Sequence, residues 1–375
     1  MAMYDNRLWL TAGIAENANA NDVWSSTDGE TWVQVTAAAS FSARNSHQLV
    51  TFNDELWLIA GGDNNVWSST DGVTWDLKAQ FESFEARREF EVAELNGQLW
   101  LVGGLGSQRF NDVWTSTDGV VWNRVLEQAP FSARNSHTLT SFNGKLWLIA
   151  GSDNGAFKND VWSSEDGVTW VLVRENAEFS TRGGHQTFSF NNRLWVIGGL
   201  SPASGFENDV WSSSDGVTWI EETDSAAFSG RYLHKIASYN EKLWLVGGFS
   251  GALEDDIWSS IDGITWVQEI SAATFGTRAA HELINFDGHL WLLAGFRDSP
   301  SVSDVWSSTD GTTWVQETDD AAFGRITWHE TAVIDDRLLL IGGRTATGFT
   351  NEVWSTTSEN GSTWQKAHHT IFEFE

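Results

Sequence analysis

The chain has no cysteine, few basic residues and no long apolar run, and each shortage excludes a class of protein. Without cysteine there can be no disulfide, no thiolate-bound zinc and no catalytic thiol. The 22 Lys and Arg against 51 Asp and Glu leave a formal net charge of -29. This disfavours nucleic acid and anionic membrane surfaces as partners, because phosphate binding needs clustered Lys and Arg. Solubility is the simpler reason for the acidity.

No stretch of 18 apolar residues occurs, and residues 1–20 contain neither a basic start nor an apolar run. We therefore expect no membrane span and no signal peptide in this chain. The sequence leaves the compartment open, with a secreted or cell-surface location slightly favoured.

Tryptophan is abundant, and the 24 Trp residues follow a repeat of about 47 residues. Three Trp positions recur in a fixed order, which gives a count of eight repeats. The first series is Trp9, Trp57, Trp100, Trp147, Trp195, Trp244 and Trp291, with Leu339 in the eighth place; the second is Trp24, Trp67, Trp114, Trp162, Trp211, Trp258, Trp306 and Trp354; the third is Trp32, Trp75, Trp122, Trp170, Trp219, Trp266, Trp314 and Trp364.

Each repeat contains four short runs rich in β-branched and aromatic residues, separated by Asn-Gly, Asn-Asp or Asp-Gly pairs that favour tight turns. In the second repeat these runs are residues 47–52, 56–60, 66–69 and 74–77. The pattern predicts one four-stranded meander for each repeat. A single meander cannot bury both faces, so successive meanders must stack around an axis. The predicted fold is an all-β propeller of eight four-stranded blades, with seven blades plus an irregular segment as the alternative.

Two glycines follow the second run in five repeats, at residues 61–62, 103–104, 198–199, 247–248 and 342–343, and a Trp lies near the end of each repeat. With these features the chain resembles the kelch-repeat family over essentially its whole length. Three repeats depart from the glycine pair, at residues 12–13, 151–152 and 294–295. The turn Ser-Thr-Asp-Gly-x-Thr-Trp is similar to a shortened Asp-box, which is a folding element. The resemblance implies that the first strand of each blade is innermost.

We expect one propeller domain over residues 1–375. The C-terminal residues 369–374 match the first strand of a repeat, and the N-terminus begins just before a second strand at Leu8, so the two ends are predicted to share a blade. Only five residues separate Trp364 from His369, where the other repeats have 15. The alternative is that residues 1–4 partly supply the missing strand.

The connection between the second and third strands is the one that varies most in length, and variable loops on a fixed scaffold usually carry binding function. An Arg-x-x-His element precedes the first strand of most repeats. If that strand is innermost, the arginines ring the channel mouth and form an anion site. The alternative is that each pairs with a neighbouring Asp or carbonyl. These candidate residues are Arg44, Arg87, Arg134, Arg182, Arg231, Arg278 and Arg325.

Residues that break the repeat are better site candidates than residues that make it. Trp328 is the one Trp outside the three series, and it directly precedes His329. Arg88 and Glu89 break the pattern in the third repeat, and Tyr232 does so in the sixth. These four complete the predicted binding site. The evenly spaced histidines are interpreted as structural, so no metal ligand is assigned.

No catalytic constellation is visible, so the sequence favours a monomeric, cofactor-free binding scaffold for a protein or carbohydrate, acting through the loop face and channel mouth. The alternative is a sugar-active enzyme, since sialate mutarotases and galactose oxidases share kelch-like propellers. The oxidase is excluded because its copper site needs a cysteine. A mutarotase would need only arginine with a carboxylate or histidine, such as Arg87, Glu89, Arg231 and His234. A sialidase is less favoured, because its Arg triad cannot be identified.

Overall fold

The computed structural model describes residues 1–15, 18–44, 48–52, 54–59, 65–79, 84–154, 156–297, 301–356 and 363–367. Its strands form eight four-stranded antiparallel sheets, each built from four consecutive strands. This confirms the eight four-stranded blades of the predicted all-β propeller. Within these residues no helix has the length and apolar character needed to cross a bilayer.

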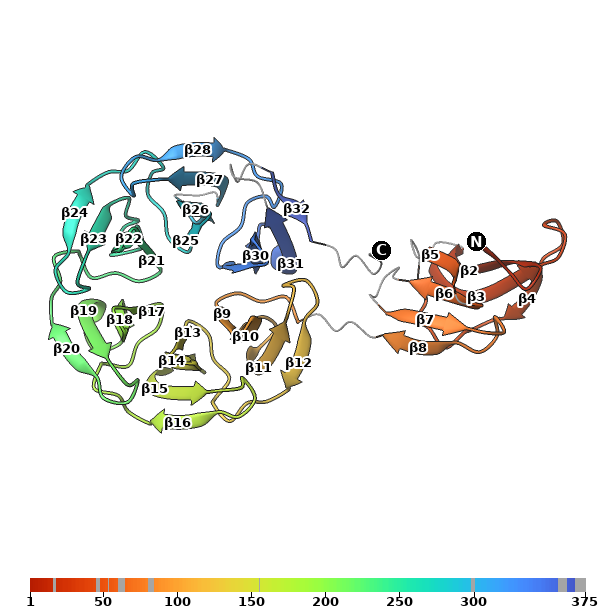
Figure 1. The fold of residues 1–375 in the computed structure, drawn as a ribbon, viewed down its shortest axis with the longest axis horizontal. Coiled ribbons are helices and arrows are strands. Elements are labelled where there is room, and N and C mark those ends of the chain that lie inside the picture. The colour runs from red at the N-terminus through yellow and green to blue at the C-terminus, as the bar shows by residue number, and fades with distance from the viewer. Residues whose placement is uncertain are drawn as a thin grey trace. The chain divides into compact units, whose positions relative to one another are not determined.

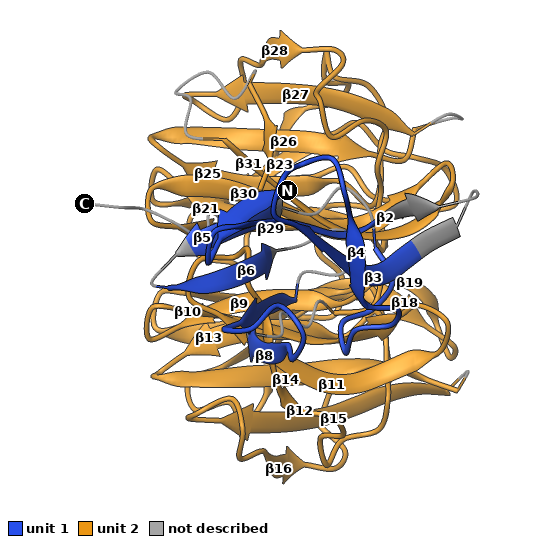
Figure 2. Ribbon diagram, turned by 90° about the vertical axis from the view of Figure 1, so that its right-hand side faces the viewer, with its two compact units in different colours: residues 1–82 blue, residues 83–375 orange. Residues whose placement is uncertain are grey.

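The chain divides into two compact units, Met1–Glu82 and Ser83–Glu375, which are coloured separately in Figure 2. The single domain over residues 1–375 stays a prediction. The first unit holds two sheets: β1 (Ala2–Tyr4), β2 (Arg7–Ala15), β3 (Ala18–Ser26) and β4 (Val33–Thr36), then β5 (Gln48–Phe52), β6 (Glu55–Ile59), β7 (Val66–Ser69) and β8 (Asp76–Ala79).

The first sheet takes its leading strand from the N-terminus. β1 pairs with β2 in the register Ala2↔Trp9 and Tyr4↔Arg7, so all four strands of this sheet come from residues 2–36. Residues 2–4 thus form the first strand of this sheet, while a blade shared by the two ends of the chain stays a prediction. Residues 369–374, to which the shared strand was assigned, lie outside the described residues.

The second unit holds the other six sheets. They are β9 (Glu91–Leu95), β10 (Gln98–Leu105), β11 (Arg109–Ser116) and β12 (Asn123–Leu126); β13 (Thr138–Phe142), β14 (Lys145–Asp153), β15 (Ala156–Ser164) and β16 (Val171–Arg174); β17 (Gln186–Phe190), β18 (Arg193–Ser201), β19 (Gly205–Ser213) and β20 (Ile220–Thr223); β21 (Lys235–Tyr239), β22 (Lys242–Val246), β23 (Ile257–Ser260) and β24 (Val267–Ile270); β25 (Glu282–Phe286), β26 (His289–Gly295), β27 (Val302–Ser308) and β28 (Val315–Thr318); and β29 (Glu330–Ile334), β30 (Arg337–Thr345), β31 (Gly348–Thr356) and β32 (Gln365–Lys366).

These six sheets form a closed ring within residues 83–375. Figure 1 shows the first strand of each sheet near the axis and the fourth at the rim, as the kelch resemblance implies. The ring closes where β29 contacts β9. Across this junction Arg337 Nη2 donates to Asp118 O at 3.0 Å and Asn351 Nδ2 donates to Phe84 O at 3.1 Å.

In five repeats the Trp of the second strand packs against a glycine of the next sheet, which explains why both residues recur; these residues are Trp9, Trp100, Trp147, Trp195 and Trp244. Trp147 is 4% exposed, and a Cβ placed on Gly216 would lie 2.2 Å from its Cη2 atom. At the closing junction Leu339 takes the place of the Trp and contacts Gly119. Burial of these large side chains is the main apolar contribution to the stacking of neighbouring sheets.

The Asp-box-like turns fix the connection between third and fourth strands. In one of them Asp215 Oδ1 accepts the amide N–H groups of Val217 and Thr218 at 2.8 and 2.9 Å, while Gly216 N donates to Ser213 Oγ at 2.8 Å. Because this turn extends through the third-series Trp, the fourth strand of the second repeat begins at Asp76 rather than at the expected residue 74.

Candidate binding site at the channel mouth

Most of the predicted arginines lie inside the blades and not at the channel mouth, which corrects the sequence-based assignment. Their exposed fractions are at most 1%, so they are closed to a ligand. Five of them pair with the Asp that precedes the second-series Trp position by two residues. The pairs are Arg87–Asp112, Arg134–Asp160, Arg182–Asp209, Arg231–Asp256 and Arg278–Asp304, while the equally buried Arg44 donates to the carbonyl and hydroxyl of Ser42.

The guanidinium of Arg182 shows why such a residue is structural. Nη1 and Nη2 donate to the two carboxylate oxygens of Asp209 at 2.7 and 2.6 Å. Nη1 also donates to Gly198 O, and Nε and Nη2 donate to the carbonyl and hydroxyl oxygens of Ser180. All five N–H donors are thus used within the fold. The alternative stated from the sequence, pairing with a neighbouring Asp and carbonyls, describes these arginines.

Arg325 differs from the other predicted arginines. Ile326, which is 1% exposed, occupies the buried position, and its backbone N–H makes the equivalent bond, to Val302 O. Arg325 is exposed and borders a polar surface depression with Arg297 and Asp320. It therefore lies apart from the channel residues described next.

Six residues with positive φ form a ring at one end of the channel. Each directly precedes the first buried ring side chain of its blade, Phe90 or a histidine, and five backbone N–H···O bonds of 2.9 to 3.2 Å link them in sequence order. They are Glu89 (φ 52°), Ser136 (56°), Gly184 (62°), Leu233 (56°), Ala280 (50°) and Trp328 (52°). A left-handed conformation is unfavourable for bulky residues such as Trp328, and such strain is concentrated at functional sites.

We call this end of the channel the mouth. The predicted site residues Arg88 and Glu89 of the third repeat meet Trp328 of the eighth repeat here. The guanidinium of Arg88 lies 4.8 Å from the ring centroid of Trp328, and that of Arg344 lies 5.8 Å from it. Arg88 also pairs with the carboxylate of Glu89, whose second oxygen accepts the side-chain amide of Asn135 at 2.5 Å. The structure therefore brings together the residues that break the repeat in the third and eighth repeats.

Tyr232, the candidate of the sixth repeat, lies in an aromatic group beside the mouth. Its ring stacks on Phe206 with centroids 5.7 Å apart and an interplanar angle of 15°, and Phe249 meets both rings edge-on. Burial and the charge of Glu89 raise the pKa of the Tyr232 hydroxyl, so it is a neutral hydrogen-bonding group at neutral pH. Residues that enter the first strand bridge to residues that leave the second strand, as Tyr232 does with Phe249, so both loop regions share this face.

Below the mouth lies a layer of buried histidines, confirmed by the structure as interior side chains. Burial, with the charge of Arg134, lowers the pKa of His137 to about 3, and burial lowers that of His329 to about 3. They are therefore neutral at physiological pH. Among the residues the structure describes, no three His, Asp or Glu side chains are placed to hold a metal ion.

The following layer holds a charged cluster that the sequence reasoning missed. Lys235 Nζ lies 2.6 Å from Glu282 Oε1 and 3.7 Å from Glu330 Oε1. Burial opposes the ammonium charge, yet Glu282, Glu330 and Glu91 together raise the pKa of Lys235. Burial, opposed by Lys235 and assisted by Glu282, raises the pKa of Glu91 to about 7. The side chains of Lys235, Glu91 and Glu330 keep some surface open to the channel.

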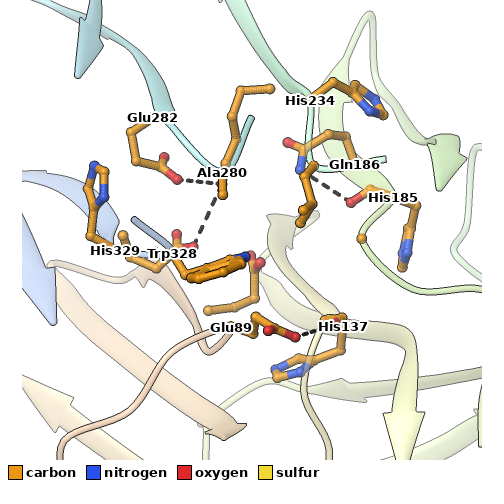
Figure 3. A pocket seen from close by; sticks show the side chains of 15 residues that line it. Glu89, His137, His185, Gln186, His234, Ala280, Glu282, Trp328 and His329 are labelled. Atoms are coloured by element: carbon orange, nitrogen blue, oxygen red, sulfur yellow. Dashed lines mark hydrogen bonds and ion pairs between the residues drawn. The ribbon is translucent and has the colours of Figure 1, made fainter. Parts of the chain in front are cut away.

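One cavity joins the mouth to this cluster, and Figure 3 shows its lining residues, including Glu89, Trp328 and Glu282. Its volume is about 50 Å³, which suits a few water molecules and not a sugar.

A signal for Lys235 was present in the sequence, because a charged residue on an innermost strand must face the channel or another charge. The position of Arg344 also carried a signal in the sequence, because Arg344 directly follows the glycine pair at residues 342–343 and lies beside the entry to the first strand of its blade.

The chain matches the family described as the DUF6242 beta propeller domain over residues 1–261 and again over residues 164–371. It is similar to the structure of YjhT with a TM-score of 0.63 and 17% sequence identity, covering 76% of this chain and 99% of that chain. At this identity the similarity shows the fold alone. No curated protein matches the chain. The kelch resemblance stays a prediction, and the family match leads to one conclusion: the chain belongs to the DUF6242 beta propeller domain family.

Proposed function

We propose that the chain is a carbohydrate-binding propeller whose ligand lies on the channel mouth. The observation that carries the proposal is the cation–aromatic group of Trp328, Arg88 and Arg344 beside the carboxylate of Glu89. A half-buried indole offers an apolar face to the C–H side of a sugar ring, and the charged groups offer hydrogen bonds to its hydroxyls. Phe206 and Tyr232 add a second aromatic surface, which lies beside Gly184 of the same ring of positive-φ residues.

Two further features support binding at this place. The left-handed backbone of Trp328 and Glu89 is held by hydrogen bonds from neighbouring blades, so the mouth is preorganised. The residues there differ from blade to blade, whereas the buried Arg–Asp pairs repeat. A scaffold element repeats, and a recognition element need not.

The test is a glycan array followed by calorimetric titration of the strongest glycan. Trp328→Ala is expected to weaken its affinity about tenfold or more, because the stacked face is lost. Phe296→Ala is the matched control, since Phe296 is an exposed aromatic that bridges to Ala279 and is not among the residues that line the channel cavity. A glycan bound equally by all three proteins, or no glycan bound by wild type, would contradict the proposal, and the second result would favour a protein partner.

A second candidate is a sugar epimerase of the mutarotase type, and Glu91 is the observation that favours it. In anomer exchange a base takes the anomeric hydroxyl proton, the bond from the anomeric carbon to the ring oxygen breaks, the ring oxygen gains a proton, and the ring recloses on the other face. A carboxyl with a pKa of about 7 suits both proton transfers. Because the cavity is too small for a sugar, the sugar would have to lie at the mouth, and a water would have to relay the proton.

Proton NMR of anomer exchange, with sialic acid as the probe, separates the two candidates. A rate above the buffer rate that Glu91→Gln abolishes would favour the epimerase. Arg87 and Arg231, named from the sequence as possible catalytic groups, are buried in the blades. Glu89 and His234 are the members of that set that line the cavity.

A further inference from the structure

A polar depression of about 700 Å³ lies within residues 83–375, where the seventh repeat meets the eighth. Its walls include Arg297 after β26, Ser303 on β27, and Asp320 and Arg325 between β28 and β29. The residues that line it differ from those that line the channel cavity. Sites for small ligands have volumes of about 300–1,000 Å³, so this depression is large enough for a sugar-sized molecule.

The depression exists because this blade lacks an asparagine that other blades share. Asn111, Asn159 and Asn208 each donate to two backbone carbonyls of the loop that follows the fourth strand, at 2.9 to 3.0 Å. Ser303 stands in this place, and its shorter side chain donates instead to Asp320 Oδ1 at 3.0 Å. The space that the amide group fills in the other blades is therefore open here.

A glycine ahead of the buried arginine is a second departure from the repeat. Gly276 stands where four repeats have a serine, whose oxygens accept bonds from the arginine, as Ser180 does from Arg182. Gly276 has φ 74°, and the buried Nε of Arg278 has no acceptor among the described atoms. The guanidinium of Arg297 occupies the room of the missing side chain, because a Cβ placed on Gly276 would lie 2.4 Å from its Nη2.

The two exposed arginines of the depression are available to a ligand. In the part of the chain that the structure describes, the side chains of Arg297 and Arg325 form no ion pair and no hydrogen bond. Arg278, by contrast, is paired with Asp304 inside the blade. The depression therefore presents two guanidiniums whose N–H groups lack acceptors, and such groups bind a carboxylate or a phosphate well.

The acidic side chains of the depression decide which of these anions fits. Asp319 and Asp320 line it together with the two exposed arginines, so these four charges cancel. A dianionic phosphate would be repelled by the two aspartates more strongly than a monocarboxylate would. Aspartate carboxylates also accept hydrogen bonds from hydroxyl groups, which a sugar supplies.

We propose that this depression is a second binding site, for a carboxylated sugar of the hexuronate class. The carboxylate lies on the guanidiniums of Arg297 and Arg325, and the hydroxyls of the sugar donate to Asp319 and Asp320. The site uses none of the residues of the channel mouth, so it stands whether or not a glycan binds there.

Calorimetric titration of the full chain with glucuronate tests the proposal, with glucose as the neutral probe. The wild-type protein is expected to bind glucuronate and not glucose. Arg325→Gln should weaken the binding of glucuronate about tenfold or more, because a charge-assisted contact is lost. Arg193→Gln is the matched control, since it removes the same charge from a residue that pairs with Glu222 outside the depression, and it should leave the affinity unchanged.

Ser303→Asn separates binding from folding. It restores the asparagine of the other blades, so it should fill the depression and abolish glucuronate binding while the melting temperature stays at or above the wild-type value. Trp328→Ala, at the mouth, should leave glucuronate binding unchanged. Failure of this site and failure of the mouth are therefore distinguishable.

Labelling with phenylglyoxal, followed by peptide mass spectrometry, reports whether the two guanidiniums are accessible in the full chain. Arg297 and Arg325 should react and be protected by glucuronate, whereas Arg278, which is 0% exposed, should stay unlabelled. The proposal would be overturned by any of four results: no binding of glucuronate, equal binding of glucose, tighter binding of glucose 6-phosphate than of glucuronate, or no labelling of the two exposed arginines.

Discussion

The glycines on which the second-strand Trp residues pack give a prediction whose size can be worked from the structure. Gly216→Ala carries two costs. The residue has φ 74°, and a left-handed conformation costs an L-residue about 1–2 kcal/mol. The new Cβ would also lie 2.2 Å from Cη2 and 2.3 Å from Cζ3 of Trp147, a buried indole anchored by its bond to Phe142 O. Overpacking of this kind costs about 1–3 kcal/mol, so the sum is about 2–5 kcal/mol.

Urea unfolding followed by tryptophan fluorescence measures this loss of unfolding free energy. Gly144→Ala is the matched control, because Gly144 has φ 70° and no described atom within 4 Å of the Cβ position. It should lose only the backbone cost of about 1–2 kcal/mol. Gly119→Ala should fall between the two, since its Cβ meets Leu339 Cδ1, the end of a flexible side chain. Equal losses for Gly216→Ala and Gly144→Ala would refute the reasoning that the indole leaves no room for a side chain at Gly216.

Two further predictions concern the buried charges and histidines. Arg182→Ile leaves Asp209 without its cationic partner inside the blade and should lower the unfolding free energy, measured in urea, by about 3–5 kcal/mol. Arg325→Ile, at an exposed site, should change the unfolding free energy by no more than about 0.5 kcal/mol. Equal effects of the two substitutions would contradict the structural role of the buried arginines. Burial, with nearby positive charge, lowers the pKa of His234 to about 3 in the folded chain. The unfolded chain therefore binds a proton at this histidine below about pH 6.5, whereas the folded chain does not. The contribution of His234 to the unfolding free energy is present above about pH 6.5 and is lost as the pH falls toward about 3. His234→Phe, which copies Phe90 of the third repeat, should therefore reduce the slope of unfolding free energy against pH between 6 and 4.5 by about 1.4 kcal/mol per pH unit, and an unchanged slope would show that His234 is not held neutral.

The periodic part of the sequence predicted the fold well because each repeat encodes its own four strands and turns. The strand predicted at residues 66–69 is β7, and the repeat Trp residues lie between sheets as expected. The ring closure within residues 83–375 could not be predicted. The closure depends on the contact between the sheets of β29 and β9. Because the repeats have nearly the same sequence, the sequence does not show which two of them make this contact.

The site was predicted in part, and the two kinds of evidence differed in value. Arg88, Glu89, Tyr232 and Trp328 break the repeat, and the structure places them at the channel mouth or directly beside it. The repeated arginines were misplaced because each pairs with an Asp that lies 25 to 27 residues later in the sequence, and this separation leaves no local signal of the pairing. Lys235 and its carboxylates come from different blades, so their proximity appears only in the closed ring.

The most direct test of this account compares Trp328→Ala with Trp195→Ala for both glycan binding and stability. Trp195 is 2% exposed and packs on Gly263, so its loss should cost about 3–5 kcal/mol of unfolding free energy while the folded protein binds as wild type. Trp328→Ala should do the reverse, with weaker binding and little change in unfolding free energy. If Trp328→Ala destabilises as much as Trp195→Ala, or if it binds glycan as wild type does, the channel mouth is not the binding site.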